Sequence, residues 1–256
     1  MPTDLAGDLA AALDPVVLAR RMGIEPDEWQ ARVLRSPKAQ VILNCARQVG
    51  KSTVTGALAS HTALYEPGAP ILLLSPTERQ SVELLRKVKG TLAALGTETA
   101  EVEVNNALSL EFASGSRILA LPGKEGTIRG FSGVRLLIID EASRVPDALY
   151  QAVRPMLAVS GGRLVLLSTP CGKRGFFHHE WTEGGADWER VEITAYDCPR
   201  IARAWLDKER ATIGDWWFEQ EYLCQFKETT DQVFGYDDVM GALSNDVPLL
   251  FPPQEA

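Results

Sequence analysis

The chain has 256 residues, of which 45% are hydrophobic and 23% charged, and its formal net charge is −8. This is the composition of a globular protein with one large domain and a small appendage, and no apolar run approaches the roughly 18 residues of a membrane span. The acidity excludes a uniformly basic nucleic-acid-binding surface but allows local basic patches.

The N-terminal region predicts short helices. Residues 4–21 have the pattern of one or two amphipathic helices interrupted at Pro15, and a further helix begins within residues 26–30. Residues 1–14 contain three acidic residues, Asp4, Asp8 and Asp14, and no basic one, so we expect no secretory signal. The four cysteines are far apart and form no C-x-x-C pair, which favours free thiols over disulfides or a zinc site.

Residues 41–53 read as a strand, a tight loop and the start of a helix over residues 52–65. This context is typical of a phosphate-binding loop, because the helix N-terminus offers free N–H groups and a positive dipole end to an anion. Gly50 allows close backbone approach, Lys51 can reach the β- and γ-phosphates, and the Ser52 hydroxyl can ligate Mg²⁺. The predicted nucleotide contacts in this loop are Arg47, Gln48, Val49, Gly50, Lys51, Ser52 and Thr53.

The match to the phosphate-loop pattern is imperfect, because Cys45 stands where the first glycine belongs. The alternative interpretation of this stretch is an ordinary strand-to-helix turn with an exposed lysine. Arg47 could likewise be a surface cation, although a guanidinium inside a phosphate loop is better explained by contact with the nucleotide.

Three later apolar runs predict further strands buried on both faces, at residues 71–74, 136–139 and 164–167. Residues 78–95 predict a long helix, and residues 146–158 contain a helix bent at Pro155. Short strands with turns at 105–106 and 114–115 are expected within residues 101–121, followed by a glycine-rich loop over 122–133. Alternating strands and helices predict an α/β fold with a mainly parallel sheet flanked by helices.

The predicted strands all end in small polar residues. Functional groups of parallel sheets gather at these carboxyl ends, which makes the nucleotide-site interpretation much stronger. The ends in question are residues 44–52, 75–77, 140–141 and 168–170.

Asp140 and Glu141 follow directly after a buried strand. An aspartate at this point can hold Mg²⁺ through water, and the adjacent glutamate can orient and deprotonate the water that attacks the γ-phosphate. The alternative is a strand that ends in acids because solvent begins there. With a phosphate loop upstream we favour catalysis by Glu141 and metal binding by Ser52 and Asp140.

Asp-Glu at this position is typical of the additional-strand P-loop ATPases. More narrowly, the chain resembles the ATPase domain of the large terminase subunit of tailed bacteriophages over about residues 26–235. The residues that carry the resemblance are Trp29-Gln30, Arg47-Gln48-Val49-Gly50-Lys51-Ser52, Ile128-Arg129-Gly130, Ser168-Thr169-Pro170, Phe218-Glu219-Gln220-Glu221-Tyr222 and Val233-Phe234.

This resemblance implies roles for individual residues. Gln30 would contact adenine, Arg47 would be the arginine of a deviant Walker A loop, and Arg129 would be an arginine finger that reaches the nucleotide of the next subunit. Residues 168–170 (Ser168, Thr169 and Pro170) would form the coupling motif, which transmits hydrolysis to movement. Gln30 could instead be a solvated helix residue, and Arg129 could pair with Glu125 or another acid.

The resemblance also implies cofactors and partners. ATP and Mg²⁺ would be bound, and double-stranded DNA would be moved into a procapsid together with a portal protein and a small terminase subunit. The chain would be a monomer in isolation and a homo-oligomeric ring on assembly. It would work in the host cytoplasm and transiently at the procapsid portal, with no membrane partner.

We expect a P-loop ATPase core over residues 1–195, a helical lid subdomain over 196–246 and a linker over 247–256 that leads to a missing nuclease domain. Helices are predicted at 199–212 and 215–226. Two other functions stay open at this point. One is a superfamily-two helicase or related remodelling ATPase, and the other is a nucleotide-gated binding module with slow turnover, against which Glu141 argues.

Overall fold

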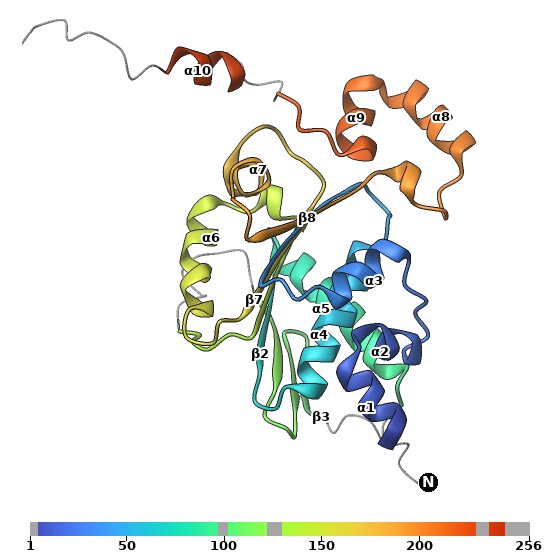
Figure 1. Cartoon of the computed structure of the whole chain (residues 1–256), viewed down its shortest axis with the longest axis vertical. Coiled ribbons are helices and arrows are strands. Elements are labelled where there is room, and N and C mark those ends of the chain that lie inside the picture. Colours follow the sequence, from blue (N-terminus) through green and yellow to red (C-terminus); the bar gives the residue numbers. More distant parts are fainter. Residues whose placement is uncertain (1–4, 97–101, 122–129, 229–235, 244–256) are drawn as a thin grey trace, which may run out of the picture.

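The protein is described from a computed structural model, which covers residues 5–96, 102–121, 130–228 and 236–243 (Figure 1). Its centre is an eight-stranded sheet with the order β3-β4-β5-β2-β6-β7-β1-β8. Neighbours from β5 to β8 run parallel, whereas β3 and β4 add an antiparallel edge. The strands are β1 (Gln40–Cys45), β2 (Pro70–Leu74), β3 (Val102–Asn105), β4 (Ser109–Phe112), β5 (Arg117–Leu121), β6 (Leu136–Asp140), β7 (Arg163–Ser168) and β8 (Trp188–Ile193).

The four predicted buried strands are confirmed as β1, β2, β6 and β7, and they lie next to one another at the centre of the sheet. Alternate side chains of each strand enter two different apolar clusters. On β6, for example, Ile138 packs into one cluster and Ile139 into the other, and both side chains are completely buried. Burial on both faces is why these strands are continuous apolar runs rather than alternating ones.

Helices cover both faces of the sheet, as predicted (Figure 1). The helices α4 and α5 pack together on the face that also carries α1 to α3, whereas α6 and α7 lie on the opposite face. Their bounds are α1 (Leu5–Leu13), α2 (Pro15–Arg21), α3 (Glu28–Arg35), α4 (Lys51–Tyr65), α5 (Glu78–Ala93), α6 (Asp147–Val153) and α7 (Gly175–Thr182).

The predicted breaks in the helices are also confirmed. Helix α1 ends at Leu13 and α2 begins at Pro15. Between them, the Asp14 carboxylate caps α2 by accepting a hydrogen bond from the Val16 N–H at 2.9 Å. Helix α6 ends at Val153 and continues as a 3-10 helix over Arg154–Leu157, because Pro155 cannot donate to the α-helical ladder.

The strand β7 lies between β1, which leads into the phosphate loop, and β6, which ends in Asp140. It pairs with both in parallel, so that Ser168 lies opposite Asn44 and Leu167 lies opposite Asp140. This is the additional strand that the resemblance implies. It brings the ends of three strands, and their polar side chains, to one point on the sheet edge.

The C-terminal part of the described chain is helical. Helix α8 (Arg203–Ile213) begins four residues later than predicted, and α9 (Asp215–Leu223) packs against it beyond the carboxyl edge of the sheet, followed by α10 (Tyr236–Ala242) (Figure 1). The division into a core over 1–195 and a lid over 196–246 stays a prediction. The predicted linker over 247–256 lies outside the described residues.

Among the residues that the structure describes, no helix is both long and apolar enough to cross a membrane.

Gly162 lies directly before β7, at a position where there is no room for a side chain. A Cβ atom there would lie 2.0 Å from the Val134 carbonyl oxygen and 2.9 Å from Leu157 Cδ2. Since backbone cannot yield cheaply, we expect Gly162→Ala to lower the free energy of unfolding by more than about 2 kcal/mol, measured by urea denaturation.

Gly241→Ala is the matched control, because a Cβ atom at Gly241 meets nothing within 4 Å. Its effect should stay within about 0.5 kcal/mol of wild type. Equal stability of the two variants would contradict the packing described for Gly162.

Candidate active site

The loop between β1 and α4 has the backbone of a phosphate-binding loop. Gly50 has a φ of 99°, a left-handed conformation that favours glycine, and α4 begins at the next residue, Lys51. Gln48 also has a positive φ, 63°. The N-terminal N–H groups of α4 therefore open toward the loop, as anion binding requires.

Three neighbouring segments hold this loop. The Gln30 side-chain amide on α3 donates to the Gly50 carbonyl oxygen at 3.3 Å, and Arg200 donates to the Val49 carbonyl oxygen at 3.1 Å. From α9, the backbone carbonyl of Glu221 accepts the Arg47 N–H at 3.2 Å. A Cβ atom on Gly50 would lie 2.7 Å from Gln30 Nε2, so a larger residue would displace the Gln30 amide in addition to straining the backbone at this φ.

Both ends of the Gln30 amide are engaged within the protein. Its oxygen accepts the Asp27 N–H at 2.9 Å, which completes a capping box at the start of α3. The side chain is 4% exposed and lies beneath the phosphate loop, outside the cavity above it. In this conformation Gln30 supports the loop, and its predicted contact with adenine stays a prediction.

A cavity of about 630 Å³ opens over the loop. The cavity is lined by most of the predicted phosphate contacts, by one face of α5 and by the turn after α2. Val49 is fully buried and is the one predicted loop contact that does not line the cavity. The lining residues are Met22, Ile24, Arg47, Gln48, Gly50, Lys51, Ser52, Thr53, Lys87, Gly90, Thr91 and Glu141.

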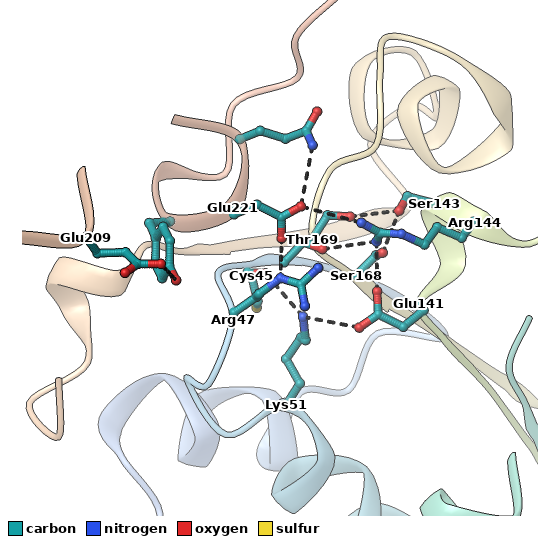
Figure 2. A network of polar contacts seen from close by, with 12 residues as sticks. Cys45, Arg47, Lys51, Glu141, Ser143, Arg144, Ser168, Thr169, Glu209 and Glu221 are labelled. Carbon is teal, nitrogen blue, oxygen red and sulfur yellow. Dashed lines mark hydrogen bonds and ion pairs between the residues drawn. The ribbon is translucent and has the colours of Figure 1, made fainter. Parts of the chain in front are cut away.

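Lys51 and Glu141 face each other across this cavity, with 3.9 Å between Lys51 Nζ and Glu141 Oε1 (Figure 2). Lys51 also donates to the Cys45 carbonyl oxygen at 3.4 Å. Glu141 has a φ of 49°, which is strained for a residue with a side chain; such strain clusters at functional sites. The two residues predicted to act on the γ-phosphate are therefore neighbours in space although 90 residues apart in sequence.

Asp140 ends β6 next to these groups. Burial and the neighbouring Glu141 charge raise the pKa of Asp140 to about 6, while the Lys51 and Lys87 charges act in the opposite direction. A hydroxyl and a carboxylate are ligands of the type that Mg²⁺ prefers, so Ser52 and Asp140 fit the predicted metal site. Among the described residues, no group of three or more histidine, cysteine or acidic side chains could hold a metal ion.

Arg144, which sequence reasoning missed, connects Glu141 to the predicted coupling motif. It donates to Glu141 Oε2 at 2.9 Å and to Thr169 Oγ1 at 3.1 Å (Figure 2). The hydroxyl of Ser143 lies 2.7 Å from the Ser168 hydroxyl and donates to the Thr169 carbonyl oxygen, also at 2.7 Å. Glu141 and the end of β7 are thus bound to the same short turn.

Glu221 extends this network to α9. Its carboxylate pairs with Arg47 Nε and lies 3.5 Å from Arg144 Nη2, so one acid on α9 contacts an arginine from the phosphate loop and one from the turn after Glu141 (Figure 2). The Glu221 side chain is only 11% exposed, and its salt bridge with Arg47 raises the pKa of that guanidinium. Pairing two guanidinium groups offsets the desolvation of this carboxylate.

The structure thus brings together the phosphate loop, Asp140, Glu141 and the predicted coupling residues Ser168 and Thr169, with Pro170 buried directly after them. Arg129 lies outside the described residues. Arg144 and Arg200 were missed because isolated cations carry no motif. Lys87 was noted only within the basic run over residues 86–89. Glu221 was noted only as part of a longer segment.

Fold and site together define a P-loop nucleotide-binding protein with an additional strand, β7, between the strand that leads into the phosphate loop and the strand that ends in Asp140. Residues 42–239 match the family described as terminase large subunit, T4likevirus-type, N-terminal. The chain belongs to that family. Matching large terminase subunits include those of Thermus phage G20c (25% identity over 253 residues, 86% of this chain and 52% of the relative) and Escherichia phage T5 (25% over 222 residues, 83% and 50%).

Solved structures agree on the fold. The ATPase domain of the large terminase of Thermus phage P74-26 has a TM-score of 0.73 at 22% identity, with 81% of this chain and 96% of that domain covered. The large terminase of another thermophilic bacteriophage, solved in complex with ADP, has a TM-score of 0.65 at 15% identity, covering 78% and 54%. The chain spans about half the length of the curated relatives it matches.

We expect Gln30→Ala to weaken binding of ATP and GTP equally, each by about 1 kcal/mol, because the amide supports the loop that both triphosphates share. Competition binding against a fluorescent nucleotide measures both affinities. A loss confined to ATP, which would change the ATP-to-GTP ratio by roughly 1–3 kcal/mol, would mean instead that the amide turns to the adenine as the sequence predicts.

Proposed function

We propose that this chain is the ATP-hydrolysing motor domain of a viral terminase and that it translocates double-stranded DNA into a procapsid. The observation that carries the proposal is the pair formed by Lys51 and Glu141 across the cavity above the phosphate loop, at 3.9 Å. A cation for the transferring phosphoryl group and a carboxylate for the attacking water are the two protein groups that this reaction requires.

In the proposed reaction, Glu141 accepts the proton of the water that attacks the γ-phosphate. Lys51 and the N–H groups at the start of α4 stabilise the negative charge on the phosphate oxygens. Arg144 holds Glu141 from the side away from Lys51, through the hydrogen bond at 2.9 Å, and so sets the direction of its carboxylate. Arg47 lies within reach of the same cavity and would contact the γ-phosphate in its own subunit.

Ser52 and Asp140 would hold Mg²⁺, which supplies charge neutralisation on the β- and γ-phosphates when bound. Hydrolysis of the nucleotide would change the contacts of Arg144 with the coupling motif and the contacts of Glu221 on α9. Both connections consist of hydrogen bonds and ion pairs to groups that a nucleotide would contact, so loss of the γ-phosphate changes the charge that these arginines meet.

The proposed partners are double-stranded DNA, a portal protein and a small terminase subunit, with the chain monomeric alone and assembled as a homo-oligomeric ring at the procapsid portal in the host cytoplasm. Family membership supports this set and does not favour the helicase alternative. A nuclease domain would belong to the remainder of the whole protein, since the relatives are about twice as long as the part that this chain matches.

We expect Lys51→Ala and Glu141→Gln to separate binding from chemistry. Glu141→Gln keeps the shape of the side chain but loses the base, so ATP should still bind while hydrolysis falls about 10²–10⁴-fold. Lys51→Ala should weaken ATP binding as well, because the ammonium contributes to both. Nucleotide titration and steady-state phosphate release measure the two effects, and near-wild-type turnover of Glu141→Gln at saturating ATP would refute the assignment.

We also propose, from the sequence, that Arg129 acts in trans as an arginine finger, an effect worth about 10³–10⁵ in rate in other nucleotide hydrolases. Arg129→Ala and Glu141→Gln subunits should each be inactive alone. Mixed under assembling conditions, they form interfaces where an intact Glu141 meets an intact Arg129, so phosphate release should partly return.

The control is a mixture of either single variant with the double variant, which contains no interface with both intact residues and should stay inactive. Absence of recovery at every mixing ratio, with assembly verified by light scattering, would mean that Arg129 acts within its own subunit.

A further inference from the structure

Helix α5 contributes a lysine to the phosphate loop. Lys87 Nζ donates to the Ser52 hydroxyl oxygen at 2.9 Å, although the two residues are 35 positions apart and Lys87 belongs to no nucleotide-binding motif. The contact joins an ammonium group to the hydroxyl that is predicted to ligate Mg²⁺.

One face of α5 forms a wall of the cavity. Lys87, Gly90 and Thr91 follow one another at helical spacing and line the same space as Lys51, Ser52 and Glu141. The Lys87 charge also acts on Asp140, where it lowers the pKa that burial raises. The Lys87 ammonium therefore contacts one proposed protein ligand of the cation, Ser52, and acts on the other, Asp140, through its charge alone.

Lys87 differs in this from the other cations of its run. Arg86 pairs with Glu83 one turn earlier on the helix surface, and Lys89 donates to the Asn106 carbonyl oxygen in the turn between β3 and β4. From the sequence alone, the run Arg86-Lys87-Val88-Lys89 is either a patch that tracks DNA phosphate or a solvated helix face. The geometry separates its members, because Lys87 is directed to the phosphate loop and the other two are not.

We propose that Lys87 is a tethered cation that occupies the metal position of the phosphate loop until Mg²⁺ arrives, and that it thereby sets the magnesium requirement of nucleotide binding. This inference rests on the proposed binding of ATP with Mg²⁺. An ammonium 2.9 Å from the Ser52 oxygen and a divalent cation bound directly to that oxygen repel each other strongly, so Lys87 has to move aside for the metal.

The two roles of the ammonium have opposite effects. Without metal, Lys87 supplies positive charge next to the triphosphate and supports binding of free ATP. With metal, the same charge competes for Ser52 and Asp140. Removing it should therefore make ATP binding depend more strongly on Mg²⁺ while making the site easier for Mg²⁺ to occupy.

The experiment titrates the whole chain with a fluorescent ATP analogue, first in EDTA and then at fixed analogue with increasing Mg²⁺. Lys87→Met should weaken metal-free binding about 3- to 10-fold and lower the Mg²⁺ concentration for half-maximal signal by a similar factor, the scale of one exposed charge-assisted contact. Lys87→Arg keeps the charge and should retain metal-free binding. Lys89→Met is the matched control, since it removes the same charge from the same helix and should change neither quantity.

The inference is overturned if Lys87→Met has the metal-free affinity and the Mg²⁺ midpoint of wild type, or if Lys89→Met shifts both as far as Lys87→Met does, since helix charge alone would then be sufficient. Failure of the wild-type chain to bind the analogue with Mg²⁺ would refute the proposed function, a different outcome from intact binding that is insensitive to Lys87. Thermal unfolding of each variant verifies that the exposed substitutions leave the fold intact.

Discussion

The central strands β2, β6, β7 and β1 are buried on both faces of the sheet, and this constraint determines where chemistry can occur. A strand in that position accepts almost no polar side chain along its length, since an unpaired polar group buried there costs about 1–3 kcal/mol. Polar residues can therefore gather only where the strands end. Parallel pairing then aligns those ends, so that Ser168 lies opposite Asn44 and Leu167 opposite Asp140 at one edge.

Glu221 gives this edge a connection to the C-terminal helices. One carboxylate on α9 meets guanidinium groups from the phosphate loop and from the turn after Glu141, and its backbone carbonyl accepts the Arg47 N–H. Because the side chain is 11% exposed, loss of either arginine partner would leave a poorly solvated charge. The position of α9 and the charge in the cavity therefore depend on each other.

The sequence predicted most of the fold, because buried parallel strands are continuous apolar runs and helix breaks are marked by residues such as Pro15 and Pro155. It missed β8, where Glu189, Arg190 and Glu192 interrupt the apolar pattern of an edge strand. The neighbours Lys51 and Glu141, and the proposed metal ligands Ser52 and Asp140, could be named from the sequence because they occupy fixed positions in short motifs. Their roles in catalysis and metal binding stay predictions. Arg144, Arg200, Glu221 and Lys87 could not, because their roles arise from tertiary contacts between residues far apart in the sequence.

The order of the strands has a consequence for how the protein folds. In the sheet, β1 lies between β7 and β8, which come much later in the chain, at Arg163–Ser168 and Trp188–Ile193. Such non-local pairing is slow, since a long loop must close before any contact forms. During synthesis the strand that leads into the phosphate loop cannot form these pairs until β7 and then β8 have left the ribosome, whereas β2 and β5 can pair much earlier. A complete nucleotide site is therefore a late product of folding, and a nascent chain that binds ATP has already assembled the centre of its sheet.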